Sequence, residues 1–149
     1  MAALVTLVLG TLGARLAGLM GWAYVDSWLA AIAVGVAAMF VVTGVAHFVN
    51  PLRREMIAIV PPQLPAPGLL VTVTGVLELV GAAGLLYPPT RVAAAVCLAV
   101  LLLVMFPANV YAGRMPNPPK SMYTPLPLRT VEQLVFVSAA LVVGLGGVQ

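Results

Sequence analysis

One carboxylate in a long apolar stretch is the first feature of this chain that could carry chemistry. The stretch Leu69 to Tyr87 (LLVTVTGVLELVGAAGLLY) contains no charged residue except Glu78 at its centre. About 19 helical residues span roughly 29 Å, the thickness of a membrane hydrocarbon core. An ionisable group at that depth is costly, which makes it a candidate functional site. Small residues three and four positions away predict that Glu78 points into a helix bundle.

Three further polar residues lie near the ends of other apolar runs. His47 lies near the end of the second run, Asn109 lies near the end of the fourth, and Gln133 follows Arg129 at the start of the fifth. The expected topology puts these ends on one side of the membrane, with Glu78 about 15 Å deep beneath them. The sequence therefore predicts a polar pocket that faces the cytoplasm and has a carboxylate as its floor.

Each of these residues also has a structural interpretation. Glu78 could be a hydrogen-bonding group or half of an ion pair, and His47 could cap its helix. Pro107 removes a helical N–H and is expected to bend the fourth run, so Asn109 could serve the bent backbone. Arg129 could anchor the fifth run at the interface.

A second charged residue lies within an apolar run. Arg15 is about 20 Å from the cytoplasmic end of the first run, close to the depth of Glu78. We therefore predict that Arg15 and Glu78 form an ion pair inside the bundle, although an arginine can also reach toward the interface. Cys97, the single cysteine, is expected to pack in the core.

The elements that position these residues follow from the composition. The chain has 149 residues, 62% hydrophobic and 7% charged, whereas a soluble domain is about a quarter charged. We predict an all-α, polytopic transmembrane helix bundle that forms one domain over residues 1–149. Its five spans are expected at residues 2–21, 28–49, 69–87, 92–112 and 131–147.

Several classes of site do not fit this composition. One histidine, one cysteine and no acidic cluster argue against a metal centre or a disulfide. No haem ligand pair or flavin motif is present. Basic residues scattered over loops do not form a nucleic-acid surface.

Loop charges predict the orientation. Five basic residues follow even-numbered spans or precede the fifth, whereas Arg91 and Asp26 lie on the other side. The five are Arg53, Arg54, Arg114, Lys120 and Arg129. The positive-inside rule then predicts a multi-pass protein of the cell membrane with a cytoplasmic N-terminus and an external C-terminus. The two proline-rich connectors, residues 50–67 and 114–130, are expected to be extended and stiff.

Four segments carry a family resemblance. They are GVAHFVNP (44–51), VPPQLPAPGLLVTVTGVLELVGAAGLLYPPTR (60–91), FPANVYA (106–112) and LPLRTVEQ (126–133). In this order and spacing they resemble the DoxX-like membrane proteins over residues 33–145. The resemblance implies a four-helix core, to which residues 2–21 add a helix. The recurring polar positions of that family correspond here to His47, Pro51, Glu78, Pro107 and Asn109.

The resemblance also implies an association with membrane-bound oxidoreductases, such as subunits of thiosulfate:quinone oxidoreductase. One hypothesis is a small subunit whose pocket binds a quinone or similar lipophilic molecule. His47 and Asn109 would bond its carbonyl oxygens, and Glu78 would relay a proton. No activity of the chain on its own can be named.

The alternative is a non-catalytic scaffold or assembly factor, whose proline-rich connectors dock a membrane or peripheral protein. A transporter fits less well, because no inverted repeat is visible and one buried carboxylate would carry protons only in a homo-oligomer.

Overall fold

The computed structural model describes residues 1–146, and this part of the chain is helical with no strand. Within residues 1–146, five helices are long and apolar enough to cross a membrane. They are α1 (Ala2–Leu19), α2 (Trp28–Ala46), α4 (Pro67–Leu86), α5 (Arg91–Arg114) and α6 (Leu126–Gly146). The predicted all-α, polytopic bundle is therefore confirmed. The predicted end of the last span, residue 147, lies outside the described residues.

Short helices fill the connections. They are η1 (Ala23–Val25), α3 (Leu52–Ala58), η2 (Pro88–Thr90) and η3 (Lys120–Met122). Both connectors were predicted to be extended, and this is wrong in part. Helix α3 occupies residues 52–58 of the first connector, and α6 already begins at Leu126 in the second. Pro127 lies in the first turn of α6, where its missing N–H removes no intrahelical hydrogen bond.

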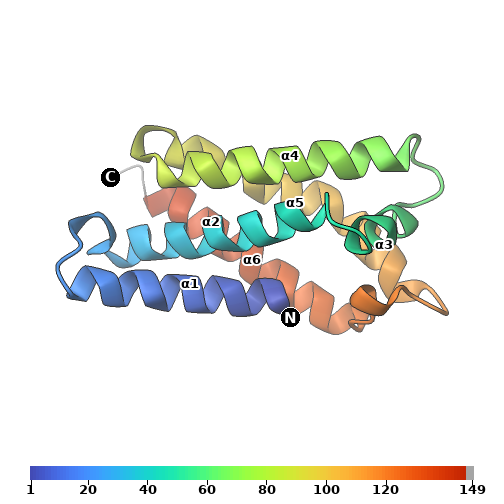
Figure 1. The fold of residues 1–149 in the computed structure, drawn as a ribbon, viewed down its shortest axis with the longest axis horizontal. Helices are drawn as coiled ribbons and strands as arrows, with labels where there is room; N and C mark the ends of the chain where they lie inside the picture. The colour runs from blue at the N-terminus through green and yellow to red at the C-terminus, as the bar shows by residue number, and fades with distance from the viewer. Residues whose placement is uncertain (147–149) are drawn as a thin grey trace.

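Helix α2 is the central element. It packs against α1, α4 and α6, and α5 joins α4 to α6. Figure 1 shows α2 between α1 and α4, and α1 begins partway along the bundle, short of the end that holds α3. The largest fully buried side chains belong to α2, α4, α5 and α6. They are Phe40, Met39, Leu85, Leu98, Val36 and Val143.

Glycine lets α1 approach α2 closely. A Cβ on Gly35 would lie 2.0 Å from Thr11 Oγ1 and 2.7 Å from the carbonyl oxygen of Leu7. Such small residues at a helix crossing are typical of membrane bundles. In lipid the hydrophobic effect does not drive helices together, so their association depends on close van der Waals packing. The rest of α1 presents a row of exposed aliphatic side chains.

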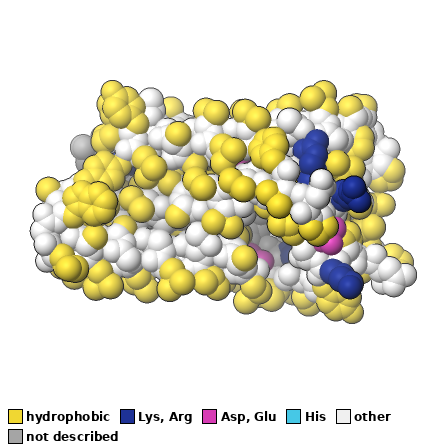
Figure 2. Space-filling view, viewed as in Figure 1, with side chains coloured by type: hydrophobic (Ala, Val, Ile, Leu, Met, Phe, Trp, Pro, Cys, Tyr) yellow, Lys and Arg dark blue, Asp and Glu magenta, His cyan; other side chains and the backbone are white. Residues whose placement is uncertain are grey.

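The outer surface is apolar along most of the bundle. Figure 2 shows hydrophobic side chains over the length of the helices and basic side chains gathered at the end that holds α3. This distribution is the one expected of a membrane-embedded protein, with a charged end outside the hydrocarbon region.

Candidate functional site

A cavity of about 610 Å³ opens among the helices near the α3 end of the bundle. All four residues predicted to form the pocket, His47, Glu78, Asn109 and Gln133, line it, and so does Pro107. Most of the remaining lining is apolar and includes four of the seven methionines. Methionine side chains are flexible and adapt to ligands of irregular shape. The cavity therefore has the size and lining typical of a small-molecule site.

One wall of the cavity is formed by α2 and α4, which a hydrogen bond joins. Thr43 Oγ1 donates to Glu78 Oε2 at 2.6 Å, and His47 Nδ1 lies 2.8 Å from the carbonyl oxygen of Thr43. His47 Nε2 faces Glu78 Oε1 at 4.0 Å. The two residues are only 4% and 3% exposed. The prediction that Glu78 points into the bundle is thus confirmed.

Two glycines make this wall possible. A Cβ on Gly75 would lie 2.6 Å from His47 Cβ and 2.9 Å from His47 Cγ. A Cβ on Gly44 would lie 3.3 Å from Glu78 Cβ and still closer to the Leu79 side chain. Glycine at these positions lets α2 and α4 approach closely enough to hold His47 beside Glu78.

Arg53 of α3 fixes the ends of both helices of this wall. Its guanidinium donates to the carbonyl oxygen of His47 at 2.9 Å, to that of Gly68 at 3.1 Å and to Thr72 Oγ1 at 2.9 Å. Sequence reasoning used Arg53 only for orientation and missed this role. The available signal was its place between His47 and the third apolar run, since a planar guanidinium can join several acceptors.

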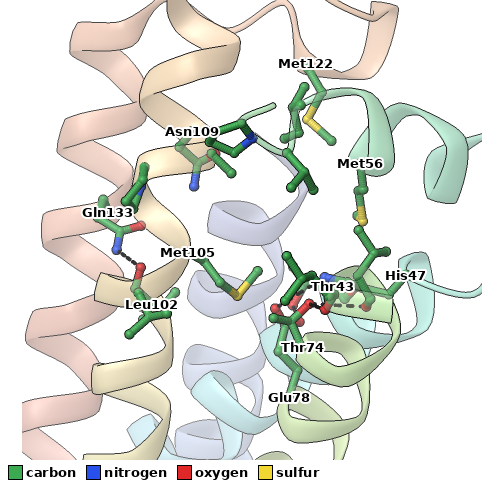
Figure 3. Close-up of a pocket in the computed structure, with 18 of the residues that line it drawn as sticks. Thr43, His47, Met56, Thr74, Glu78, Leu102, Met105, Asn109, Met122 and Gln133 are labelled. Carbon is green, nitrogen blue, oxygen red and sulfur yellow. Dashed lines mark hydrogen bonds and ion pairs between the residues drawn. The ribbon is translucent and has the colours of Figure 1, made fainter. Parts of the chain in front are cut away.

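The opposite wall belongs to α5 and α6. Arg129 Nη1 donates to Asn109 Oδ1 at 3.0 Å, and Gln133 Nε2 donates to the carbonyl oxygen of Leu102 at 2.7 Å. Leu102 lies in the helical turns before Pro107, so Gln133, and not Asn109, bonds a carbonyl of that segment. In Figure 3 the amide nitrogen of Asn109 and the carbonyl oxygen of Gln133 point toward the space across from Glu78.

Arg129 is buried rather than placed at the surface as a simple interfacial anchor. It is 8% exposed, and besides Asn109 it donates to the carbonyl oxygens of Thr124, at 2.8 Å, and Met122. It therefore ties the second connector to the start of α6. Met122 in turn lines the cavity, so this connector closes part of the pocket.

The two connectors meet beside the cavity. Pro51 is the N-cap residue of α3, and Met56 of the same helix lines the cavity. The carboxylate of Glu55 accepts hydrogen bonds from the backbone N–H of Ser121, at 3.0 Å, and from its hydroxyl group. These bonds hold the pKa of Glu55 below its usual range. The contact fastens α3 to η3 at the charged end of the bundle.

The predicted ion pair between Arg15 and Glu78 is wrong. Arg15 Nη1 lies 2.8 Å from the carbonyl oxygen of Asp26 and 3.4 Å from Asp26 Oδ1, and its guanidinium lies 5.6 Å from the centre of the Trp28 ring. Because α1 starts partway along the bundle, its later residues lie toward the η1 end, and α2 separates them from α4 (Figure 1).

Cys97 was expected to pack in the core, and this too is wrong, because its side chain is exposed. Helix α5 packs on its neighbours through residues such as Ala95 and Leu98, which leaves Cys97 on the outer side. Among residues 1–146, no group of three or more histidine, cysteine or acidic residues could hold a metal ion.

Comparison with known proteins gives a family but no activity. No curated protein and no solved structure matches the chain significantly. One family model, described as a domain of unknown function (DUF8561), matches residues 36–144. The match covers more than half of the chain and includes every residue of the two cavity walls described above, whereas α1 lies outside it. The chain therefore belongs to this DUF8561 domain family.

Proposed function

We propose that this protein is a small integral membrane subunit that holds a lipophilic, oxygen-bearing molecule of the quinone type in its cavity. The observation that carries the proposal is the cavity of about 610 Å³, in which buried His47 and Glu78 face Asn109 and Gln133 across an apolar space. Buried polar groups on two walls of an otherwise apolar pocket can orient a ligand whose oxygens lie at opposite sides of a ring.

The association with a membrane oxidoreductase rests on the resemblance to DoxX-like proteins. In this proposal the chain supplies the ligand site and a proton-carrying carboxylate, and a partner protein supplies the electron-transfer centres. An acidic group beneath a ligand oxygen can accept or return the proton that accompanies the reduction or oxidation of a quinone.

Access to the cavity fits a ligand that arrives through the bilayer. Ala3 near the start of α1 lines the cavity, and Figure 2 shows this flank hollowed between the beginning of α1 and α3. In the proposed orientation the α3 end lies in the cytoplasm. The five basic residues at this end of the bundle support that orientation through the positive-inside rule.

The experiment is native mass spectrometry of the protein extracted under mild conditions, together with organic extraction of any molecule that accompanies it. We expect one quinone-type molecule per chain, lost in the Glu78→Leu and His47→Ala variants, which remove the polar groups of this wall. The matched control is Leu77→Ala, because Leu77 neighbours Glu78 but is 48% exposed on the outer side.

The contrary result is a chain that emerges with no small molecule and takes up no added lipophilic quinone. Recovery of a bare chain in a stable complex with a second protein would instead support the scaffold or assembly-factor alternative.

A further inference from the structure

The tautomer of His47 is set by its backbone partner. Nδ1 lies 2.8 Å from the carbonyl oxygen of Thr43, and a carbonyl oxygen can only accept, so Nδ1 carries a proton. The second ring nitrogen, Nε2, is then the one that faces Glu78, and both residues line the cavity. In a neutral ring Nε2 has a free lone pair and is a hydrogen-bond acceptor.

The surroundings favour the neutral ring. The Arg53 guanidinium bonds the carbonyl oxygen of His47 itself, so a protonated imidazole would add a second positive charge nearby. A charged His47–Glu78 pair would also be expected to close to about 2.8 Å, whereas Nε2 and Oε1 are 4.0 Å apart. The carboxylate is 3% exposed, and its protonated form avoids the cost of an ionised group at that depth.

The separation of the two groups matches a single bridging atom. An oxygen placed about 2.7 Å from both His47 Nε2 and Glu78 Oε1 would see them at an angle of about 95°, within the range of ordinary hydrogen-bond geometry. Both atoms belong to residues that line the cavity. In Figure 3, His47 and Glu78 lie together on the side of the cavity opposite Asn109 and Gln133.

The bridging oxygen must both give and take a hydrogen bond. The protonated carboxyl of Glu78 donates to it, and His47 Nε2 needs a donor from it. A hydroxyl oxygen meets both requirements, whereas a carbonyl or ether oxygen can only accept and would leave Nε2 unpaired. A buried acceptor left without its donor costs free energy, and sites of this kind reject analogues that lack the matching group.

We propose that the cavity selects the hydroxyl form of its ligand, a phenol or reduced quinone with a lipophilic tail, over the corresponding carbonyl or ether. This inference rests on the proposed function and names the ligand form that the same site prefers. His47 Nε2 is the acceptor that makes the selection, and Glu78 is the donor. The amide nitrogen of Asn109 and the carbonyl oxygen of Gln133 face a second ligand oxygen.

The test uses two probes, a para-alkylphenol and its methyl ether, with the same alkyl chain and with concentrations corrected for partition into the bilayer. Binding is measured to the full chain in lipid nanodiscs by equilibrium native mass spectrometry. We expect the phenol to bind about tenfold more tightly than the ether or better, because one buried hydrogen bond is lost in the ether.

Two variants assign the preference to its residues. His47→Phe should bring the two probes to similar affinity, because it removes the acceptor. Glu78→Gln should keep the preference, because an amide N–H can donate in place of the carboxylic acid. Leu77→Ala serves as the unaffected control, and variants are compared only where thermal unfolding shows a folded chain.

The outcomes separate the two proposals. Equal binding of phenol and ether to the unmodified chain would overturn hydroxyl selection and leave a lipophilic site in place. Binding of neither probe would overturn the proposed function as well. A preference that survives His47→Phe would overturn the assignment of Nε2. The comparison on the unmodified chain decides the main point even if a variant fails to fold.

Discussion

At Gly75 the absence of a side chain decides where His47 can lie. The imidazole packs directly over the α4 backbone at this position, and a Cβ there would come within 2.6 Å of His47 Cβ. The atom that such a Cβ would meet is the His47 Cβ, which is attached directly to the backbone and can move only if the backbone of α2 moves. The local packing of α2 on α4 and the geometry of the His47–Glu78 pair therefore depend on the same residue.

The Gly75→Ala variant should lose about 1–3 kcal/mol of stability, the usual cost of overpacking a tight contact, and should bind the phenol probe more weakly. The matched control is Gly13→Ala in α1, where an added Cβ meets nothing within 4 Å and alanine is the better helix former. Thermal unfolding and probe affinity measured in nanodiscs check both. Unchanged behaviour of Gly75→Ala would contradict the close contact.

Among the elements, the seven-residue helix α3 shapes one end of the cavity. It buries no residue of its own, so polar contacts hold it in place: Arg53 on the ends of α2 and α4, and Glu55 on Ser121. Because Met56 lines the cavity, these contacts set the shape of the cavity at the charged end of the bundle.

Replacing Arg53 by lysine should loosen α3. An ammonium group keeps the charge but cannot reach the three acceptors that the planar guanidinium joins, and we expect a loss of about 1–2 kcal/mol. Amide hydrogen exchange over residues 52–58 should become faster. Arg54→Lys, at the exposed neighbouring position, should leave exchange unchanged. Equal exchange in the two variants would show that Arg53 does not fasten the helix.

For the whole molecule, the uneven charge of its two ends predicts one orientation in the membrane. Five basic residues belong to the α3 end: Arg53, Arg54, Arg114, Lys120 and Arg129. At the other end, Arg15 contacts Asp26, directly after η1, and Arg91 contacts Tyr24 of η1. The positive-inside rule places the richer end in the cytoplasm. The connectors that close the cavity would then lie on the cytoplasmic side.

Cysteine labelling checks this orientation. In a Cys97→Ala background, the Pro89→Cys variant should react with a membrane-impermeant maleimide on intact cells. The Lys120→Cys variant should react only after the cells are permeabilised. Both positions are exposed, so access to the reagent depends on the side of the membrane. The opposite labelling pattern would reverse the proposed orientation.

The sequence by itself determined the fold class and four polar residues that line the pocket. Runs of about 20 apolar residues must form helices in lipid, because every backbone polar group has to be bonded internally. Because successive spanning helices cross the membrane in opposite directions, the depth of a residue in the membrane follows from its position along its helix. That reasoning was enough to bring His47, Asn109 and Gln133 to one level, with Glu78 among small residues that mark a packed face.

Only the tertiary structure decided which polar groups pair. Depth along a helix leaves its rotation and its axial offset free, and both arise from packing against neighbours. The offset of α1 carried Arg15 away from Glu78 to Asp26, and the rotation of α5 turned Cys97 outward. The links from Arg53 to Thr72 and from Gln133 to Leu102 join segments distant in sequence. Such links depend on helix positions to within an ångström, which apolar patterning does not encode.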